Sequence, residues 1–231
     1  MKSRASYILM GICLSLMLLL TAVELVTFNQ NHYKEMFDKY DVQKETGLEI
    51  SELQVIMNDL LMYLKDDRPL LNTTRIENGQ EIPAFGERAV LHMIDVKELF
   101  IGGKRIRNFS IIAFIGLLIY SIKKNKNWKR SLAKTLVYTA VVNVSLMVIL
   151  YLLMLFDFYR YFTYFHLIFF TNDLWLLEVD ELMILMLPEG FFNDTAVRIA
   201  TLFLGSNIFI SLLGFKEFFV VRKLKSLISR S

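Results

Sequence analysis

Long apolar runs separated by polar segments dominate the pattern of the chain. We interpret four of these runs as transmembrane helices, over residues 7–26, 108–122, 135–156 and 196–217. An α-helix of about 20 apolar residues crosses the hydrocarbon core of a bilayer. The second run is shorter than this, and the basic residues before it are expected to extend the helix toward the lipid headgroups. The pattern therefore predicts four spans.

The polar segment 27–107 carries the signals of a small folded domain. In Ser51–Lys65 apolar residues recur at helical spacing, which predicts a helix with one buried face and Ser51 as its N-cap. The segment Asn31–Tyr40 is also predicted to form a helix. Asn78-Gly79 lies between two short runs and predicts a β-hairpin, because both residues tolerate the positive φ of a type I′ turn. A short helix over Glu87–Phe100 completes this α+β cap.

The second polar segment, residues 157–195, is rich in aromatic side chains. Tyr and Trp favour the level of the lipid headgroups, so we expect this segment to lie along the membrane surface. Leu182–Leu187 is too short to span a bilayer and is expected to be a re-entrant or interfacial piece.

Basic residues set the predicted orientation. The residues before the first span, the loop 123–134 and the tail 218–231 together hold twelve Lys and Arg and no Asp or Glu. Positively charged loops stay in the cytoplasm. Both termini are therefore predicted to be cytoplasmic, and the segments 27–107 and 157–195 to lie outside the cell membrane.

Composition agrees with this arrangement. The 231 residues are 55% hydrophobic, and the mean hydropathy is +0.43. The predicted class is a mainly α membrane protein with four transmembrane helices and a small α+β extracellular cap. Cys13 is the one cysteine, which excludes a disulfide framework or a cysteine zinc site within one chain. The net charge of +3 comes from localised basic residues and indicates no nucleic-acid partner, and we assume a monomer.

The predicted helix at Glu87–Phe100 carries candidate chemistry. Arg88, His92 and Asp95 fall at i, i+4 and i+7 and so share one face. A guanidinium, an imidazole and a carboxylate in this arrangement suit proton transfer. The same spacing also fits a solvated face with one ordinary histidine.

A second histidine, His166, lies among aromatic residues in the other outer segment, which makes simple packing an odd explanation for it. His32, beside polar residues early in the cap, is expected to be solvated. An imidazole with a pKa of about 6.5 exchanges protons at neutral pH. Two of them at a lipid interface indicate a general base with a general acid or oxyanion donor. Because no Gly-x-Ser-x-Gly motif occurs, any acyl transfer would use a nucleophile from the substrate or from water.

The two histidine segments together resemble the lipoprotein intramolecular transacylase (Lit) family of Gram-positive bacteria. The resemblance is carried by Glu-Arg-x-x-x-His92-Met-x-Asp95 and by Phe-His166-x-x-Phe-Phe-x-Asn172-Asp173-x-Trp, and also by the Asn-Gly hairpin. It covers nearly the whole chain.

This resemblance implies a reaction on membrane lipoproteins whose N-terminal cysteine carries a diacylglyceryl group and a free α-amine. The family moves the sn-2 acyl chain to that amine, which gives the lyso form and needs no cofactor or metal. His92 would then take a proton from the amine, with Asp95 or Arg88 fixing its tautomer, and His166 would bind the ester oxygen, although which histidine is the base stays open. The further residues expected to support the site or bind substrate are Tyr164, Phe169, Asn172, Asp173 and Trp175.

Two other functions are compatible with the residues alone. A metal-dependent membrane hydrolase would use the two histidines with nearby carboxylates, but no His-Glu-x-x-His pair is present and the ligand set is thin. A non-enzymatic sensor or assembly factor would bind a partner through its cap, and would tolerate replacement of both histidines.

Overall fold

The computed structural model describes residues 2–228, with side chains for residues 4–216. The chain divides into two compact units. The helical unit comprises Met1–Val23, Arg105–Leu152 and Arg198–Ser231, and the cap unit comprises Glu24–Lys104 and Leu153–Val197.

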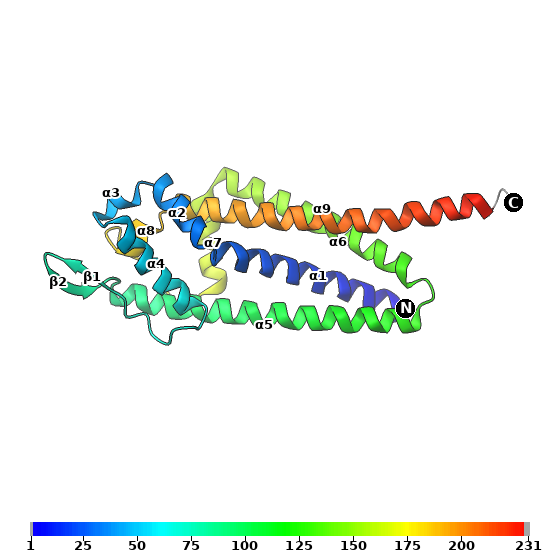
Figure 1. The fold of residues 1–231 in the computed structure, drawn as a ribbon, viewed down its shortest axis with the longest axis horizontal. Helices are drawn as coiled ribbons and strands as arrows, with labels where there is room; N and C mark the ends of the chain where they lie inside the picture. Colours follow the sequence, from blue (N-terminus) through cyan, green and yellow to red (C-terminus); the bar gives the residue numbers. More distant parts are fainter. Residues whose placement is uncertain (1, 229–231) are drawn as a thin grey trace. The chain divides into compact units, whose positions relative to one another are not determined.

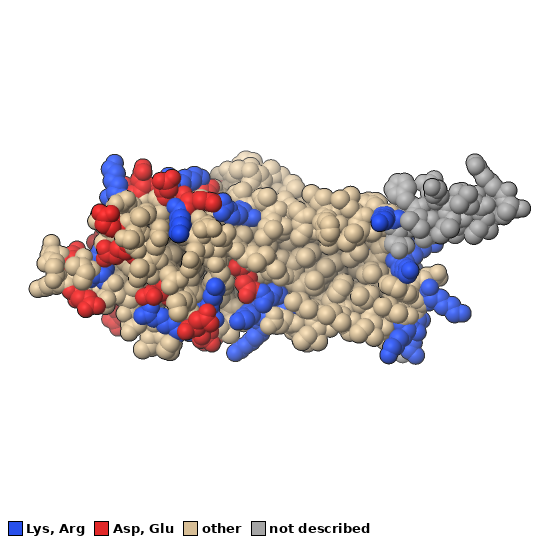
Figure 2. Space-filling view, viewed as in Figure 1, with Lys and Arg blue, Asp and Glu red and all other residues tan. Residues whose placement is uncertain are grey.

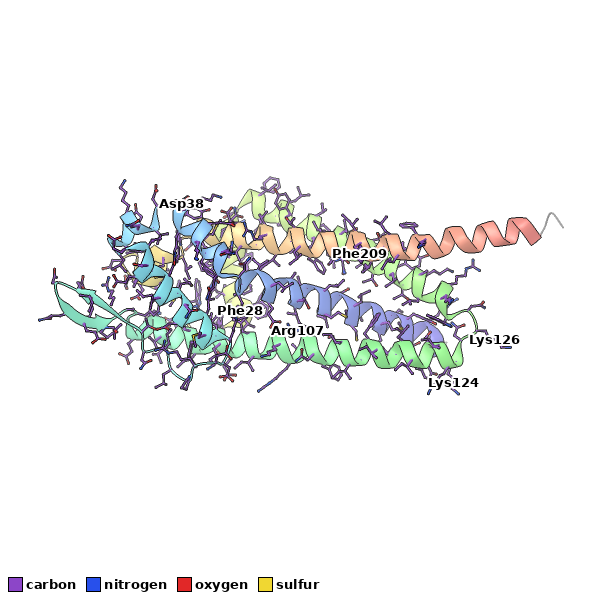
Figure 3. The ribbon with its side chains drawn as sticks, in the orientation of Figure 1. Phe28, Asp38, Arg107, Lys124, Lys126 and Phe209 are labelled. Carbon is purple, nitrogen blue, oxygen red and sulfur yellow. The ribbon has the colours of Figure 1, made fainter. Side chains whose placement is uncertain are left out.

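Four long helices supply the helical unit and are long and apolar enough to cross a membrane (Figure 1). They are α1 (Lys2–Thr27), α5 (Glu87–Lys124), α6 (Trp128–Phe156) and α9 (Glu189–Ile228). Apolar side chains project from their surfaces; Phe209 on α9, for example, is 63% exposed (Figure 3). Exposed apolar surface of this extent is expected where helices face lipid.

Polar side chains hold these helices together inside the helical unit. Ser15 of α1 donates to Asn143 of α6 at 2.9 Å, and Asn143 donates to Asn207 of α9 at 2.8 Å. At the other end of α1, the Tyr7 hydroxyl pairs with Ser121 of α5. Buried amides and hydroxyls are retained in an apolar environment only when they are hydrogen-bonded to one another, so these contacts fix which helices are neighbours.

The helices begin and end differently from the predicted spans. The predicted short helix at Glu87–Phe100 is the first part of α5, which continues through Gly102 and Gly103 to Lys124. Two glycines cost about 1 kcal/mol each in a helix, which is too little to end one of 38 residues. Most of the predicted basic loop 123–134 is also helical, because α6 begins at Trp128. The tail 218–231 continues α9 as far as Ile228, and its side chains lie outside the described residues.

Seven shorter elements build the rest of the cap unit (Figure 1). They are α2 (Gln30–Lys39), α3 (Val42–Thr46), α4 (Ile50–Leu64), β1 (Thr74–Glu77), β2 (Gln80–Pro83), α7 (Phe158–Phe169) and α8 (Leu182–Met186). The first turns of α5 and α9 also belong to this unit.

Helix α4 is the centre of the cap core. All six apolar residues of its predicted stripe are buried: Leu53, Ile56, Met57, Leu60, Leu61 and Leu64. They pack in one cluster with side chains from α2, α5 and α8. The N-cap is Glu49 rather than the predicted Ser51, which lies inside the helix. Helical hydrogen bonds already start from the Glu49 carbonyl, two residues earlier than the polar signal at Ser51 suggests.

The predicted hairpin is present. Strands β1 and β2 pair antiparallel, with Glu77 opposite Gln80. Asn78 and Gly79 connect them with φ values of 52° and 77°. Both central residues therefore have the positive φ that a type I′ turn requires.

Helix α8, predicted from the sequence as a re-entrant or interfacial piece, packs into the core of the cap unit. Leu182, Met183 and Met186 are buried in the core cluster of the cap unit. The segment is apolar because it packs against other cap helices, and a run of six residues does not distinguish this from contact with lipid.

Charged side chains are distributed unevenly between the cap unit and the helical unit (Figure 2). On the face shown in Figure 2, acidic side chains lie over the cap segments, whereas the helical unit is mostly uncharged. Lys124 at the end of α5 and Lys126 in the turn before α6 project from the chain (Figure 3). These lysines belong to the basic segments on which the predicted orientation depends.

Candidate active site

The first turns of α5 present the predicted Arg88–His92–Asp95 face to the segment that follows α7. His92 itself is only 6% exposed. Its Nδ1 atom is buried and has no hydrogen-bond partner among the described residues. His92 is therefore not a solvated histidine, although Arg88 on the same face is exposed, and its imidazole has an unused polar atom.

Helix α7 delivers the second histidine. Asp157 caps its N-terminus by accepting a hydrogen bond from the Arg160 amide, which follows the usual N-cap pattern. One helical turn separates Phe162 from His166, and the His166 Nδ1 lies 2.8 Å from the Phe162 carbonyl oxygen. A carbonyl oxygen only accepts hydrogen bonds, so Nδ1 carries the proton. In the neutral ring, the lone pair of His166 is therefore on Nε2.

The two imidazoles lie together. Their ring centroids are 6.0 Å apart with an interplanar angle of 38°. Phe170 contacts both rings, at 5.1 Å from His92 and 5.6 Å from His166. Trp175 stacks on His166 at 4.7 Å and 27°. The histidines thus share an aromatic environment that contains few competing polar groups.

Arg88 fixes the turn that carries Trp175. Its guanidinium donates to the carbonyl oxygens of Asp173 and Leu176, the latter at 3.0 Å. It also forms an ion pair of 3.1 Å with the Asp173 carboxylate. A planar guanidinium can make several directed hydrogen bonds at once, so one side chain holds both ends of the Asp173–Leu176 turn.

Asn172 connects the same turn to the other side of His92. Its Nδ2 donates to Asp95 at 2.8 Å, and its Oδ1 accepts from the Leu174 amide at 3.1 Å. Arg88 and Asp95 therefore hold the Asn172–Leu176 segment from both sides of His92 on α5. Asp95 is predicted from the sequence to orient His92, but the side chain that donates a hydrogen bond to it is Asn172.

Burial lowers the pKa of both histidines, so each is a weaker base than an imidazole in water. The pKa of His92 is lowered from 6.5 to about 4; burial is the largest cause, the neighbouring His166 also lowers it, and Asp95 partly opposes the shift. Burial also lowers the pKa of His166, and the hydrogen bond to Phe162 opposes this. Both rings belong to the cap unit and are neutral at pH 7, and His92 is the harder of the two to protonate.

Two predicted site residues lie apart from the histidine rings. The Tyr164 side chain is 49% exposed and contacts Tyr161. Phe169 is 51% exposed and contacts Phe165. Helix α7 thus turns His166 inward and these rings outward.

Sequence reasoning missed two features of the cap. Phe162 fixes the His166 tautomer through a main-chain carbonyl, which no residue type encodes, although the i, i+4 spacing from His166 is a usable signal. His32 was expected to be solvated, but it is fully buried and its Nε2 lies 2.8 Å from the Thr195 hydroxyl. The polar residues around it in sequence gave no sign of a partner 163 positions away.

No group of three or more His, Cys, Asp or Glu suited to a metal ion occurs in the described part of the chain. The rings that contact His92 and His166 are aromatic, and the polar side chains of the surrounding segments are Arg88, Asp95, Asn172, Asp173 and Trp175.

Comparison with known proteins identifies relatives of the chain. Residues 8–192 match the family described as lipoprotein intramolecular transacylase Lit. A solved structure of the membrane integral lipoprotein intramolecular transacylase Lit from Bacillus cereus shares the fold, with a TM-score of 0.78 and 21% identity over 98% of each chain. A structure of the same protein with one histidine replaced by alanine has a TM-score of 0.74 and 21% identity, over 97% of this chain and 96% of that chain. No curated protein sequence matches this chain.

Proposed function

This chain belongs to the lipoprotein intramolecular transacylase (Lit) family, and we propose that it moves the sn-2 acyl chain of a diacylglyceryl-cysteine lipoprotein to the α-amine of that cysteine. The observation that carries the proposal is the contact between His92 and His166, two buried neutral imidazoles from different helices. Such a pair suits a reaction in which one proton moves from nitrogen to oxygen.

The reaction balances without a group from outside. The α-amine nitrogen bonds to the ester carbonyl carbon, and the bond from that carbon to the sn-2 oxygen breaks. One proton leaves the nitrogen and one proton joins the released glyceryl oxygen. An ester becomes a more stable amide, so no energy source is required, and the nucleophile and electrophile are both on the substrate.

His166 is the proton carrier in this proposal. Its Nδ1–H is engaged by the Phe162 carbonyl, which leaves the Nε2 lone pair to accept a proton. The nitrogen of the attacking amine becomes strongly acidic once it has bonded to the carbonyl carbon, so even an imidazole of lowered pKa can take its proton. The same Nε2–H then donates to the departing oxygen.

His92 is the electrophilic partner. With a pKa of about 4 it is neutral at pH 7, and a neutral imidazole can donate one N–H to a developing oxyanion. Its buried Nδ1 has no partner among residues 4–216, whose side chains are described, and is the atom we assign to this hydrogen bond. The family resemblance suggested His92 as the base and left the choice between the histidines open; the fixed tautomer of His166 supports the reverse assignment.

The orientation follows from the basic segments. We propose that both termini face the cytoplasm and that the cap unit lies on the outer side of the cell membrane, where the histidines would meet their lipoprotein substrates. The exposed aromatic side chains of α7, such as Tyr164 and Phe169, would then contact lipid headgroups and acyl chains.

The test is expression of the chain in a bacterium that makes diacyl lipoproteins and lacks N-acylation. Because transfer is an isomerisation, the mass of the lipopeptide does not change, and fragmentation must locate the acyl chain. We expect one chain on the cysteine nitrogen and a free sn-2 hydroxyl. Lipopeptides that keep both chains on oxygen would contradict the proposal.

A further inference from the structure

The indole N–H of Trp175 is, like the Nδ1 of His92, a buried polar group of the cap unit that has no partner among the described residues. Its Nε1 atom is inaccessible to solvent and has no hydrogen-bond partner among the described residues. An indole N–H can only donate. A buried donor without an acceptor costs free energy, and this cost is recovered when a bound molecule supplies the acceptor.

The position of this ring is set by its surroundings. Trp175 stacks on His166 with the ring centroids 4.7 Å apart. The turn that carries it is held by Arg88, through the Asp173 and Leu176 carbonyls on either side. A donor on a turn fixed in this way is preorganised for a substrate that displaces the groups covering it, because its own direction does not have to change.

We propose that Trp175 Nε1–H donates a hydrogen bond to the carbonyl oxygen of the transferred acyl group, beside the hydrogen bond from His92. This inference rests on the proposed transacylase function and adds one catalytic residue to it. As the amine nitrogen bonds to the carbonyl carbon, the π electrons of the C=O bond move to the oxygen. The indole N–H stabilises the resulting negative charge, and it loses no proton.

Stacking and hydrogen bonding by Trp175 can be separated. Replacement of its indole by benzothiophene, through incorporation of 3-benzothienylalanine, keeps the shape and the stacked face and removes only the N–H. Trp175→Phe is genetically encoded and also removes the N–H, but it reduces the face that stacks on His166. The matched control is the same replacement at Trp128, the other tryptophan of the chain, at the start of α6 in the helical unit.

The measurement is the turnover of a synthetic S-(diacylglyceryl)cysteine lipopeptide by the purified full chain in lipid vesicles. We expect kcat to fall about 10²–10³-fold for benzothiophene at position 175, with KM and Tm near those of the unmodified protein and no change for position 128. A kcat within about twofold of the unmodified protein would overturn the role of Trp175 and leave the transacylase proposal intact. A fall in Tm with an unchanged kcat would show a purely structural role and also overturn it. Failure of the unmodified protein to transfer the chain would overturn the transacylase proposal, and this inference with it.

Discussion

The Nδ1 of His166 donates to the carbonyl oxygen of Phe162, at 2.8 Å, one helical turn earlier on α7. This hydrogen bond fixes the tautomer of His166 and leaves Nε2 as its basic atom. The neighbouring His92 has a buried Nδ1 with no hydrogen-bond partner in the part of the chain that the structure describes. The two imidazoles are therefore chemically different although they share one aromatic environment, and this difference is the basis of the roles proposed for them.

Replacement of Arg88 should reduce activity by loosening the turn that carries Trp175. Arg88→Ala removes the hydrogen bonds to Asp173 and Leu176, and we expect kcat/KM to fall about 10- to 100-fold. Arg88→Lys should behave nearly as badly, because an ammonium cannot reproduce the planar array of donors. Arg75→Lys, on the hairpin, is the matched control. Full activity of Arg88→Lys would contradict this account.

Asn172 and Asp95 should act as a pair. Their 2.8 Å hydrogen bond is the second attachment of the turn to α5. A double-mutant cycle with Asn172→Ala and Asp95→Ala should give a coupling energy of about 0.5–1.5 kcal/mol from kcat/KM. Strictly additive effects would mean that the two side chains contribute independently.

The stability of the protein should depend on pH through its histidines. Burial lowers the pKa of His92 from 6.5 to about 4 and also lowers that of His166. Between about pH 6.5 and about pH 4 the unfolded chain binds more protons, so stability is complete above this window and is lost as the pH falls through it. From about pH 7 to about pH 5, we expect the Tm of the protein in detergent to fall a few degrees more than that of His92→Gln. Equal falls would place the pKa of His92 near its ordinary value.

Helix α8 should contribute to stability as part of the cap core. Met186 is 1% exposed, whereas Val179 in the preceding loop is 83% exposed. Met186→Ala should cost about 2–5 kcal/mol of unfolding free energy, and Val179→Ala less than about 0.5 kcal/mol. Denaturant titration of the detergent-solubilised protein measures both. A small effect of Met186→Ala would contradict the burial of α8 in the cap core and would favour the interfacial position predicted from the sequence.

Patterns that depend on local chemistry were predicted well. The stripe on α4 and the Asn78-Gly79 turn follow from helical periodicity and from the φ preferences of Asn and Gly, and both are present. The shared face of Arg88, His92 and Asp95 likewise follows from helix geometry.

Features that depend on distant partners were not predictable in this way. Arg88 binds the main-chain carbonyls of Asp173 and Leu176. Every residue has a main-chain carbonyl, so the residue types do not show which ones Arg88 binds. His32 is buried against Thr195, and its neighbours in sequence are polar. The pairing of His92 with His166 was expected from the predicted topology, which puts both at the outer lipid interface, and from the family resemblance; their spacing along the chain alone predicts no contact.

The histidine roles are tested most directly by two replacements matched to the atoms involved. His92→Asn places an amide N–H near the former Nδ1, and His166→Gln places an amide near the former Nε2 but cannot accept a proton. The measurement is transfer of a ¹³C-labelled sn-2 chain to the cysteine nitrogen of a synthetic lipopeptide, followed by fragmentation mass spectrometry. We predict that His92→Asn keeps more activity than His92→Ala, and that His166→Gln and His166→Ala both lose about 10²–10⁴-fold. Rescue by His166→Gln, or transfer at the normal rate after both histidines are replaced by Ala, would contradict the account.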